Sequence, residues 1–162
     1  MMQPIDPLNQ VAEFHRTFKH PILDTPTIPA IERARLRVSL LAEELKELEE
    51  AIAQNDIVEV ADALCDLQYV LAGAVLEFGL GEKFKDLFDE VQRSNMSKTC
   101  ATEQEANATI AHYESKGQPC HHVKSGNHYL VYRTEDNKTL KSINYSAADL
   151  DRIIRLPRYV HD

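Results

Sequence analysis

Two long helical patterns separated by only two residues constrain the fold of this chain more than any other feature. Residues 31–54 carry an apolar stripe at helical spacing, and residues 57–78 carry a second, denser one. Asn55 or Asp56 is a suitable N-cap for the second helix, and Gly79 ends it. Helices joined by so short a connection pack as antiparallel neighbours. The sequence therefore predicts an αα-hairpin at the centre of the fold.

Shorter elements are predicted on both sides of this hairpin. Asp6 and Pro7 begin an N-terminal helix, and three prolines make residues 20–29 an extended loop. Downstream, the patterns predict helices over residues 81–96 and 102–115, and a last short helix that residues 146–149 cap and that runs to about residue 155. They also predict two paired strands over residues 128–133 and 138–143, and a tail from residue 156. The expected fold class is mainly α, with a helical body and a small C-terminal α+β appendage made of a hairpin plus a helix.

Composition excludes several classes of function. The formal net charge of −8 argues against nucleic acid as a partner, because such binding depends on basic patches. No apolar run approaches the roughly 20 residues that span a membrane, and the N-terminus lacks a basic segment followed by an apolar one. Three cysteines without CxxC spacing indicate neither a disulfide framework nor a zinc site, and Cys65 is expected in the core. We expect a soluble cytoplasmic protein that binds neither nucleic acid nor a membrane.

Two acidic clusters lie beside the apolar stripes of the predicted hairpin. Their members are Glu43, Glu44 and Glu47 on the first helix and Glu59, Asp62 and Asp66 on the second. Glu47 and Glu59 lie at similar heights above the turn, so the two clusters can converge. Like charges in a partly buried site repel and are costly to desolvate, so such clusters require a partner. Oxygen-only ligands favour Mg²⁺ or Mn²⁺, and magnesium held this way usually also holds substrate phosphates.

The acidic clusters resemble the signature of a known superfamily. Residues 43–47 match an EExxE pattern and residues 59–62 match ExxD, similar to the all-α nucleoside triphosphate pyrophosphohydrolases. The chain resembles the MazG-like, phosphoribosyl-ATP pyrophosphohydrolase-like branch most, on residues 11–15, 61–67 and 94–98. The resemblance covers roughly residues 5–98. It implies a MazG-like helical bundle, with residues 1–98 as the all-α pyrophosphohydrolase domain and residues 99–162 as the α+β appendage.

The resemblance also implies a reaction, namely Mg²⁺-dependent attack of water on the α-phosphorus of a nucleoside triphosphate, which yields a monophosphate and pyrophosphate. The implied metal ligands are Glu44, Glu47, Glu59 and Asp62, and the catalytic carboxylates are Glu43 and Glu44, with Glu43 as a further ligand or as the group that orients and deprotonates water. The implied substrate-binding residues are Asp66, Asn95, Lys98 and Lys141. The two lysines would meet the charge on the leaving pyrophosphate, and Asn95 would contact base or sugar.

The sequence leaves several alternatives open. The substrate could be dUTP, dCTP, another standard nucleotide or a damaged one. Phosphoribosyl-ATP is a further alternative, disfavoured by the extra C-terminal module. A different class is a non-catalytic helical dimer that binds a nucleotide or a protein, in which the carboxylates only form surface ion pairs. In either class, the apolar surface of the helical pair predicts a homodimer or a higher homo-oligomer.

Overall fold

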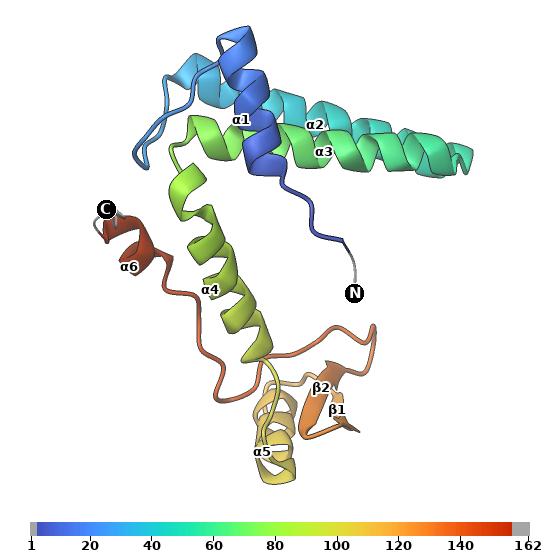
Figure 1. Cartoon of the computed structure of the whole chain (residues 1–162). Coiled ribbons are helices and arrows are strands. Elements are labelled where there is room, and N and C mark those ends of the chain that lie inside the picture. The colour runs from blue at the N-terminus through green and yellow to red at the C-terminus, as the bar shows by residue number, and fades with distance from the viewer. Residues whose placement is uncertain (1–2, 157–162) are drawn as a thin grey trace. The chain divides into compact units, whose positions relative to one another are not determined.

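The computed structural model describes residues 3–156 and is mainly helical. The elements are α1 (Pro7–Phe18), α2 (Ile31–Gln54), α3 (Ile57–Glu77), the 3₁₀ turn η1 (Gly81–Lys83), α4 (Phe84–Met96), α5 (Glu103–Glu114), β1 (Cys120–Ser125), β2 (His128–Arg133) and α6 (Leu150–Arg155). One antiparallel hairpin and a C-terminal helix complete this helical fold, which confirms the predicted fold class (Figure 1). The predicted tail lies beyond the described residues, apart from Leu156.

The chain divides into two compact units, Met1–Phe84 and Lys85–Asp162, which are described separately below. This division falls earlier in the chain than the domain boundary predicted after Lys98, which stays a prediction. Within the described residues, no single helix is long and apolar enough to cross a membrane, and α3 with Gly81–Met96 passes that test only as a bent pair.

The first unit is organised around the α2–α3 hairpin, as predicted (Figure 1). Asn55 ends α2 in the left-handed conformation, with φ 54°, and its N–H donates to the carbonyls of the last turn. Asp56 caps α3, because its carboxylate accepts hydrogen bonds from the N–H groups of Val58 and Glu59 at 2.9 and 3.2 Å. These two local signals fix the turn and therefore the antiparallel pairing of the helices.

Helix α1 packs across the C-terminal half of α3. Val11 and Ala12 of α1 are buried against Ala72 and Leu76 of α3. The loop that follows α1 closes over the end of α3, where the Leu23 N–H donates to the carbonyl of Leu76 at 3.0 Å and satisfies one of the free carbonyls of that helix end. Only this half of the hairpin is covered by α1.

Gly79 allows the loop and the helix end to approach closely. Its φ is 67°, and a Cβ at this position would lie 1.9 Å from the backbone oxygen of Thr25. Only glycine fits a positive φ with backbone so near. The glycine predicted to end the second helix therefore also allows the loop after α1 to pack against this helix end.

The second unit has its own core between α5 and the β-hairpin. The core residues are Cys100, Ala106, Cys120, Val131 and Leu140. Helix α5 begins at a reciprocal cap, in which Thr102 accepts from the Glu105 N–H at 3.1 Å and Glu105 accepts from the Ala101 N–H at 2.9 Å. The capping box predicted from the sequence is thus formed in this unit.

Two expectations are wrong. The partner of β2 is β1, with Ser125 opposite His128 across a two-residue loop, whereas the predicted strand over residues 138–143 contributes a single bridge between Thr139 and Tyr132. Gly126 supplies the positive φ of 55° that so tight a loop requires. In addition, Cys65 is exposed rather than buried in the core, because it lies on a part of α3 that α1 does not cover.

Candidate functional site

The structure brings acidic side chains of α2 and α3 together around Glu44. Burial raises the pKa of the Glu44 carboxyl most, and repulsion from four neighbours, namely Glu47, Asp66, Glu43 and Asp62, raises that pKa further. The neighbours come from both helices, which is the convergence expected from an antiparallel hairpin. Asp66 is among these neighbours, as is Asp62, so Asp66 lies with the carboxylates that surround Glu44.

Glu44 also has a buried side-chain atom without a hydrogen-bond partner. Its Oε2 atom is buried and accepts no hydrogen bond, although buried acceptors are normally paired. Within the described residues, none of the six predicted carboxylates forms an ion pair. Lys46, the one basic residue nearby in the sequence, pairs with Glu50 at 3.3 Å instead. The cluster therefore presents uncompensated oxygen ligands, which suit a hard divalent cation.

The carboxylates around Glu44 are close enough to repel one another, but their side chains are not arranged to coordinate a metal ion. In the part of the chain that the structure describes, no three Asp, Glu, His or Cys side chains are placed to hold a metal ion together. The neighbours of Glu44 in the cluster are exposed, so their side chains can rotate without disturbing the core. Glu59 is exposed on the first turn of α3 and is not among the charges that act on Glu44.

The other predicted site residues belong to the second unit. The Lys98 ammonium donates to the side-chain oxygen of Asn95 at 2.8 Å. The Lys141 ammonium lies 4.2 Å from the centroid of the Tyr145 ring. The Ser142 N–H donates to the carbonyl of Lys98 at 3.2 Å, so segments distant in sequence meet at this point. Tyr145 lies in an irregular segment with no periodic signal, and sequence reasoning missed it.

The charge of the chain is divided unequally between the units. Residues 1–84 contain 15 acidic and seven basic side chains, whereas residues 85–162 contain eleven of each. The whole formal negative charge therefore resides in the unit that carries the carboxylate cluster. This distribution makes the first unit electrostatically more favourable to cations, and less favourable to anions, than the second unit.

A buried ion cluster joins α2 and α3 in the first unit. Arg33 and Arg37 of α2 both donate to the fully buried carboxylate of Glu77 on α3, the former through Nε at 3.0 Å. His15 of α1 is buried beside them and contacts the carbonyl of Pro21 through Nδ1 at 2.9 Å. A Cβ on Gly73 would lie 2.8 Å from Arg37 and 3.1 Å from His15, so glycine makes the room. The sequence patterns gave no sign of this pairing.

The uncovered half of the hairpin exposes an apolar face. Five of its residues, namely Leu45, Ile52, Ile57, Val58 and Leu64, are 50–76% exposed. We call this set the hairpin face. Large exposed apolar side chains that lie together, rather than scattered singly, are typical of an interaction site.

The helical fold, with acidic residues on both helices of the α2–α3 hairpin, agrees with the predicted MazG-like all-α nucleoside triphosphate pyrophosphohydrolase class, and the family comparison shows this class. A family model described as phosphoribosyl-ATP pyrophosphohydrolase matches residues 11–95, more than half of the chain, and the chain belongs to this family. The match includes the carboxylate cluster and Asn95 but neither Lys98 nor Lys141. Membership supports a pyrophosphohydrolase type of activity.

A viral protein is similar to the chain over a longer range. It is an uncharacterized protein of Acanthamoeba polyphaga mimivirus, 26% identical in an alignment that covers 82% of this chain and 89% of the viral protein. This coverage exceeds the range of the family match. The similarity therefore includes part of the chain outside residues 11–95.

Proposed function

We propose that this protein is a Mg²⁺-dependent nucleoside triphosphate pyrophosphohydrolase, in which water attacks the α-phosphorus and the products are a monophosphate and pyrophosphate. The family supports a hydrolase acting on pyrophosphate bonds. The observation that carries the proposal is the buried, unpartnered Oε2 of Glu44 among four other carboxylates. If these carboxylates only formed surface ion pairs, basic side chains would lie beside them. The nearby basic residue, Lys46, forms its ion pair with Glu50 instead.

The metal would be held by the carboxylates that surround Glu44. Glu44, Glu47 and Asp62 are the proposed ligands, and Glu59 and Asp66 complete the set that α2 and α3 offer. When bound, Mg²⁺ or Mn²⁺ would neutralise the triphosphate and polarise the phosphoryl group under attack. Glu43, exposed next to this set, orients the attacking water and takes up its proton.

Three of the residues that the sequence predicts to bind substrate, namely Asn95, Lys98 and Lys141, belong to the second unit, where they keep their proposed roles as groups that bind anions or bases. Lys98 and Lys141 are ammonium donors for phosphate oxygens. Asn95 accepts a hydrogen bond from Lys98 through its oxygen, which leaves its two N–H donors for an acceptor on the base or the sugar. Phosphoribosyl-ATP is the second candidate substrate, favoured by the description of the matched family.

The proposal is tested by pyrophosphate release from standard, deoxy and modified nucleoside triphosphates and from phosphoribosyl-ATP. We expect turnover of at least one nucleoside triphosphate with Mg²⁺ or Mn²⁺ and none with EDTA. Glu47→Gln should abolish turnover, whereas Glu49→Gln, a matched change of an exposed carboxylate outside the cluster, should leave it unchanged.

Two other outcomes would contradict the proposal. Turnover of phosphoribosyl-ATP alone would assign the second candidate. A folded protein that turns over nothing, and whose melting temperature is unchanged by millimolar Mg²⁺, would indicate the non-catalytic dimer, because a ligand that binds only the folded state raises its apparent stability.

We further propose that a second copy of the chain covers the hairpin face and forms a homodimer. Light scattering coupled to gel filtration should give the mass of a dimer. Because the face is apolar, Ile52→Gln combined with Leu64→Gln should shift the protein toward the monomer at micromolar concentration. Ile28→Gln is the matched control, since Ile28 is 77% exposed but lies in the loop after α1. A monomeric wild type would refute this part of the proposal.

A further inference from the structure

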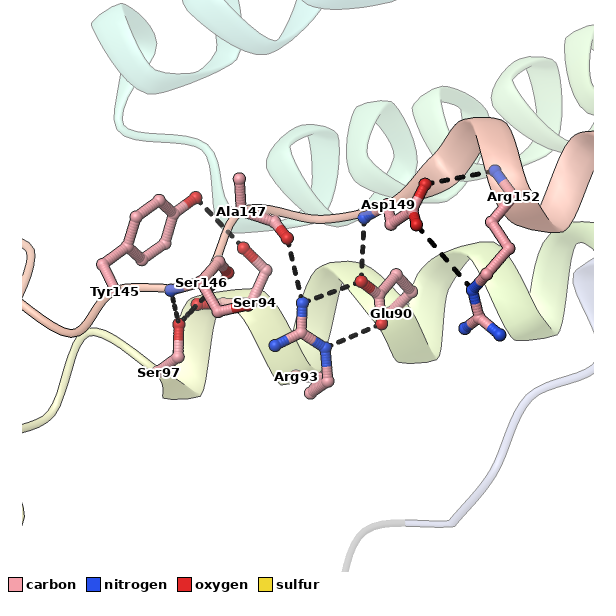
Figure 2. A network of polar contacts seen from close by, with 9 residues as sticks. All are labelled: Glu90, Arg93, Ser94, Ser97, Tyr145, Ser146, Ala147, Asp149 and Arg152. Atoms are coloured by element: carbon pink, nitrogen blue, oxygen red, sulfur yellow. Dashed lines mark hydrogen bonds and ion pairs between the residues drawn. The ribbon is translucent and has the colours of Figure 1, made fainter.

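An irregular segment, residues 145–149, runs along α4 in the second unit and is held there by hydrogen bonds (Figure 2). We call this segment the strap. The Ser146 N–H donates to Ser97 Oγ at 3.0 Å, and Arg93 Nη2 donates to the Ala147 carbonyl at 3.0 Å. The Asp149 N–H donates to the carboxylate of Glu90 at 2.8 Å. These bonds hold the backbone of the strap against α4, and they therefore also fix the position of the residue immediately before Ser146.

That residue is Tyr145, which lies against the C-terminal turn of α4 (Figure 2). The buried hydroxyl of Ser94 donates to the phenol oxygen at 3.0 Å. This hydrogen bond lowers the pKa of Tyr145 most, and the charges of Lys141, Lys98 and Arg93 lower that pKa further, against the effect of burial. With its oxygen already occupied as an acceptor, the phenol keeps its O–H for another group.

The basic side chains near this phenol differ in whether a carboxylate neutralises their charge. Arg93 forms a two-point pair with Glu90, at 2.7 and 2.8 Å. Lys98 contacts only the neutral amide of Asn95, and Lys141 lies over the Tyr145 ring. Among the described residues, neither lysine has a carboxylate partner, unlike Lys46 and Lys85. Two ammonium groups without a carboxylate partner and one available O–H donor therefore lie in the same neighbourhood, since Lys98 bonds to Asn95, next to the Ser94 that bonds to Tyr145, and Lys141 lies over the Tyr145 ring.

We propose that Tyr145, Lys141 and Lys98 form an anion-binding site within the second unit, which takes the pyrophosphate group of a polyphosphate. Several charge-assisted donors converging on one point suit a phosphate oxyanion, and an anion of higher charge gains more from two cations. The choice of pyrophosphate as the anion rests on the proposed function. The assignment of Tyr145 as a phosphate ligand rests on the geometry of the strap.

The test is calorimetric titration of the full chain with inorganic pyrophosphate and tripolyphosphate, in EDTA and at low salt. Lys141→Gln and Lys98→Gln should each weaken binding about five- to tenfold, and Tyr145→Phe about threefold. Lys124→Gln is the matched control and should bind as wild type, because Lys124 also lies over a tyrosine ring, that of Tyr129, at 5.7 Å. Circular dichroism and melting temperatures establish that each variant is folded.

The outcomes separate this site from the proposed reaction. Wild-type binding by both Tyr145→Phe and Lys141→Gln, or equal weakening by Lys124→Gln, would overturn the site. Loss of binding in the site variants would support it even if the protein hydrolysed no nucleotide, which would refute the proposed function alone.

Discussion

Glu44→Gln is expected to lower the rate of pyrophosphate release on the order of 1,000-fold, about 4 kcal/mol of transition-state stabilisation. The substitution keeps the size of the side chain and removes the charge on which the proposed metal site is centred. The measurement is kcat/KM for the best substrate at saturating Mg²⁺. Glu49→Gln, on an exposed position outside the cluster, should retain full activity. Activity within about tenfold of wild type would exclude Glu44 as a metal ligand.

The same substitution should stabilise the protein in the absence of metal. The pKa of Glu44 is raised above its ordinary value by burial and by its acidic neighbours, so the folded chain binds this proton more tightly than the unfolded chain does. At neutral pH the ionised carboxylate therefore opposes folding, and the penalty disappears as pH falls through the raised pKa. Glutamine mimics the protonated form. We expect the melting temperature in EDTA to rise by about 1–3 °C, a small effect because the cluster is largely solvated.

Loss of activity together with a gain in stability is the signature of a functional carboxylate cluster. A structural cluster would show the opposite, because removal of a stabilising charge lowers the melting temperature. Added Mg²⁺ should raise the melting temperature of the wild type more than that of Glu44→Gln, since binding to the folded state adds RT ln(1 + [L]/Kd) to stability. Equal responses of the two proteins to Mg²⁺ would count against a metal ligand at this position.

The helical part of the fold was predictable because its signals are local. Asp56 and the apolar periodicity of α2 and α3 act within a few residues, and the structure uses them as expected. Asn55, the alternative N-cap of the second helix, instead ends α2 in the left-handed conformation. The two acidic patterns were recognisable for the same reason, since a helix places i, i+3 and i+4 side chains on one face. Their convergence followed from the length of the turn.

The features that sequence reasoning missed depend on partners far along the chain. Glu77 pairs with arginines about forty positions earlier, and Tyr145 contacts Ser94 from an irregular strap. The strand β1 was overlooked because His121, His122 and Lys124 interrupt the apolar alternation that marks a half-buried strand. The segment 138–143 shows that alternation, yet Leu140 is buried in the core of the second unit without a strand around it.

The largest effect on stability is expected at Glu77, whose replacement by Gln should lower the free energy of unfolding by about 3–5 kcal/mol. Arg37 is only 6% exposed and would keep its charge without a charged partner. The expected fall in melting temperature is on the order of 10 °C. Glu82→Gln, at an exposed position shortly after α3, is the matched control and should change little. A fall of less than about 1 kcal/mol for Glu77→Gln would show that the arginines are satisfied without the carboxylate.

A compensating variant distinguishes the loss of packing from the uncompensated charge. When Arg33, Arg37 and Glu77 are replaced together by Met, Met and Leu, no charge remains buried, and much of the lost stability should return. If the triple variant is as unstable as Glu77→Gln, the ion cluster stabilises the unit by its geometry rather than by cancelling charge. The measurement is denaturant unfolding of all three proteins at one pH, because additivity fails for groups in contact.

The free energy of unfolding should fall in two steps on acidification, because His15 and Glu77 of this cluster take up protons in different pH ranges. Burial lowers the pKa of His15 below 6.5, so the unfolded chain binds that proton more tightly, and stability is lost as pH falls below about 6.5. Burial raises the pKa of Glu77, but hydrogen bonds from Arg33 and Arg37 outweigh it and leave the pKa below 4.5. Its contribution is therefore complete above about pH 4.5 and is lost as pH falls further. Glu77→Gln should abolish the second loss and keep the first, and a wild-type acid profile in that variant would assign the low-pH step to other carboxylates.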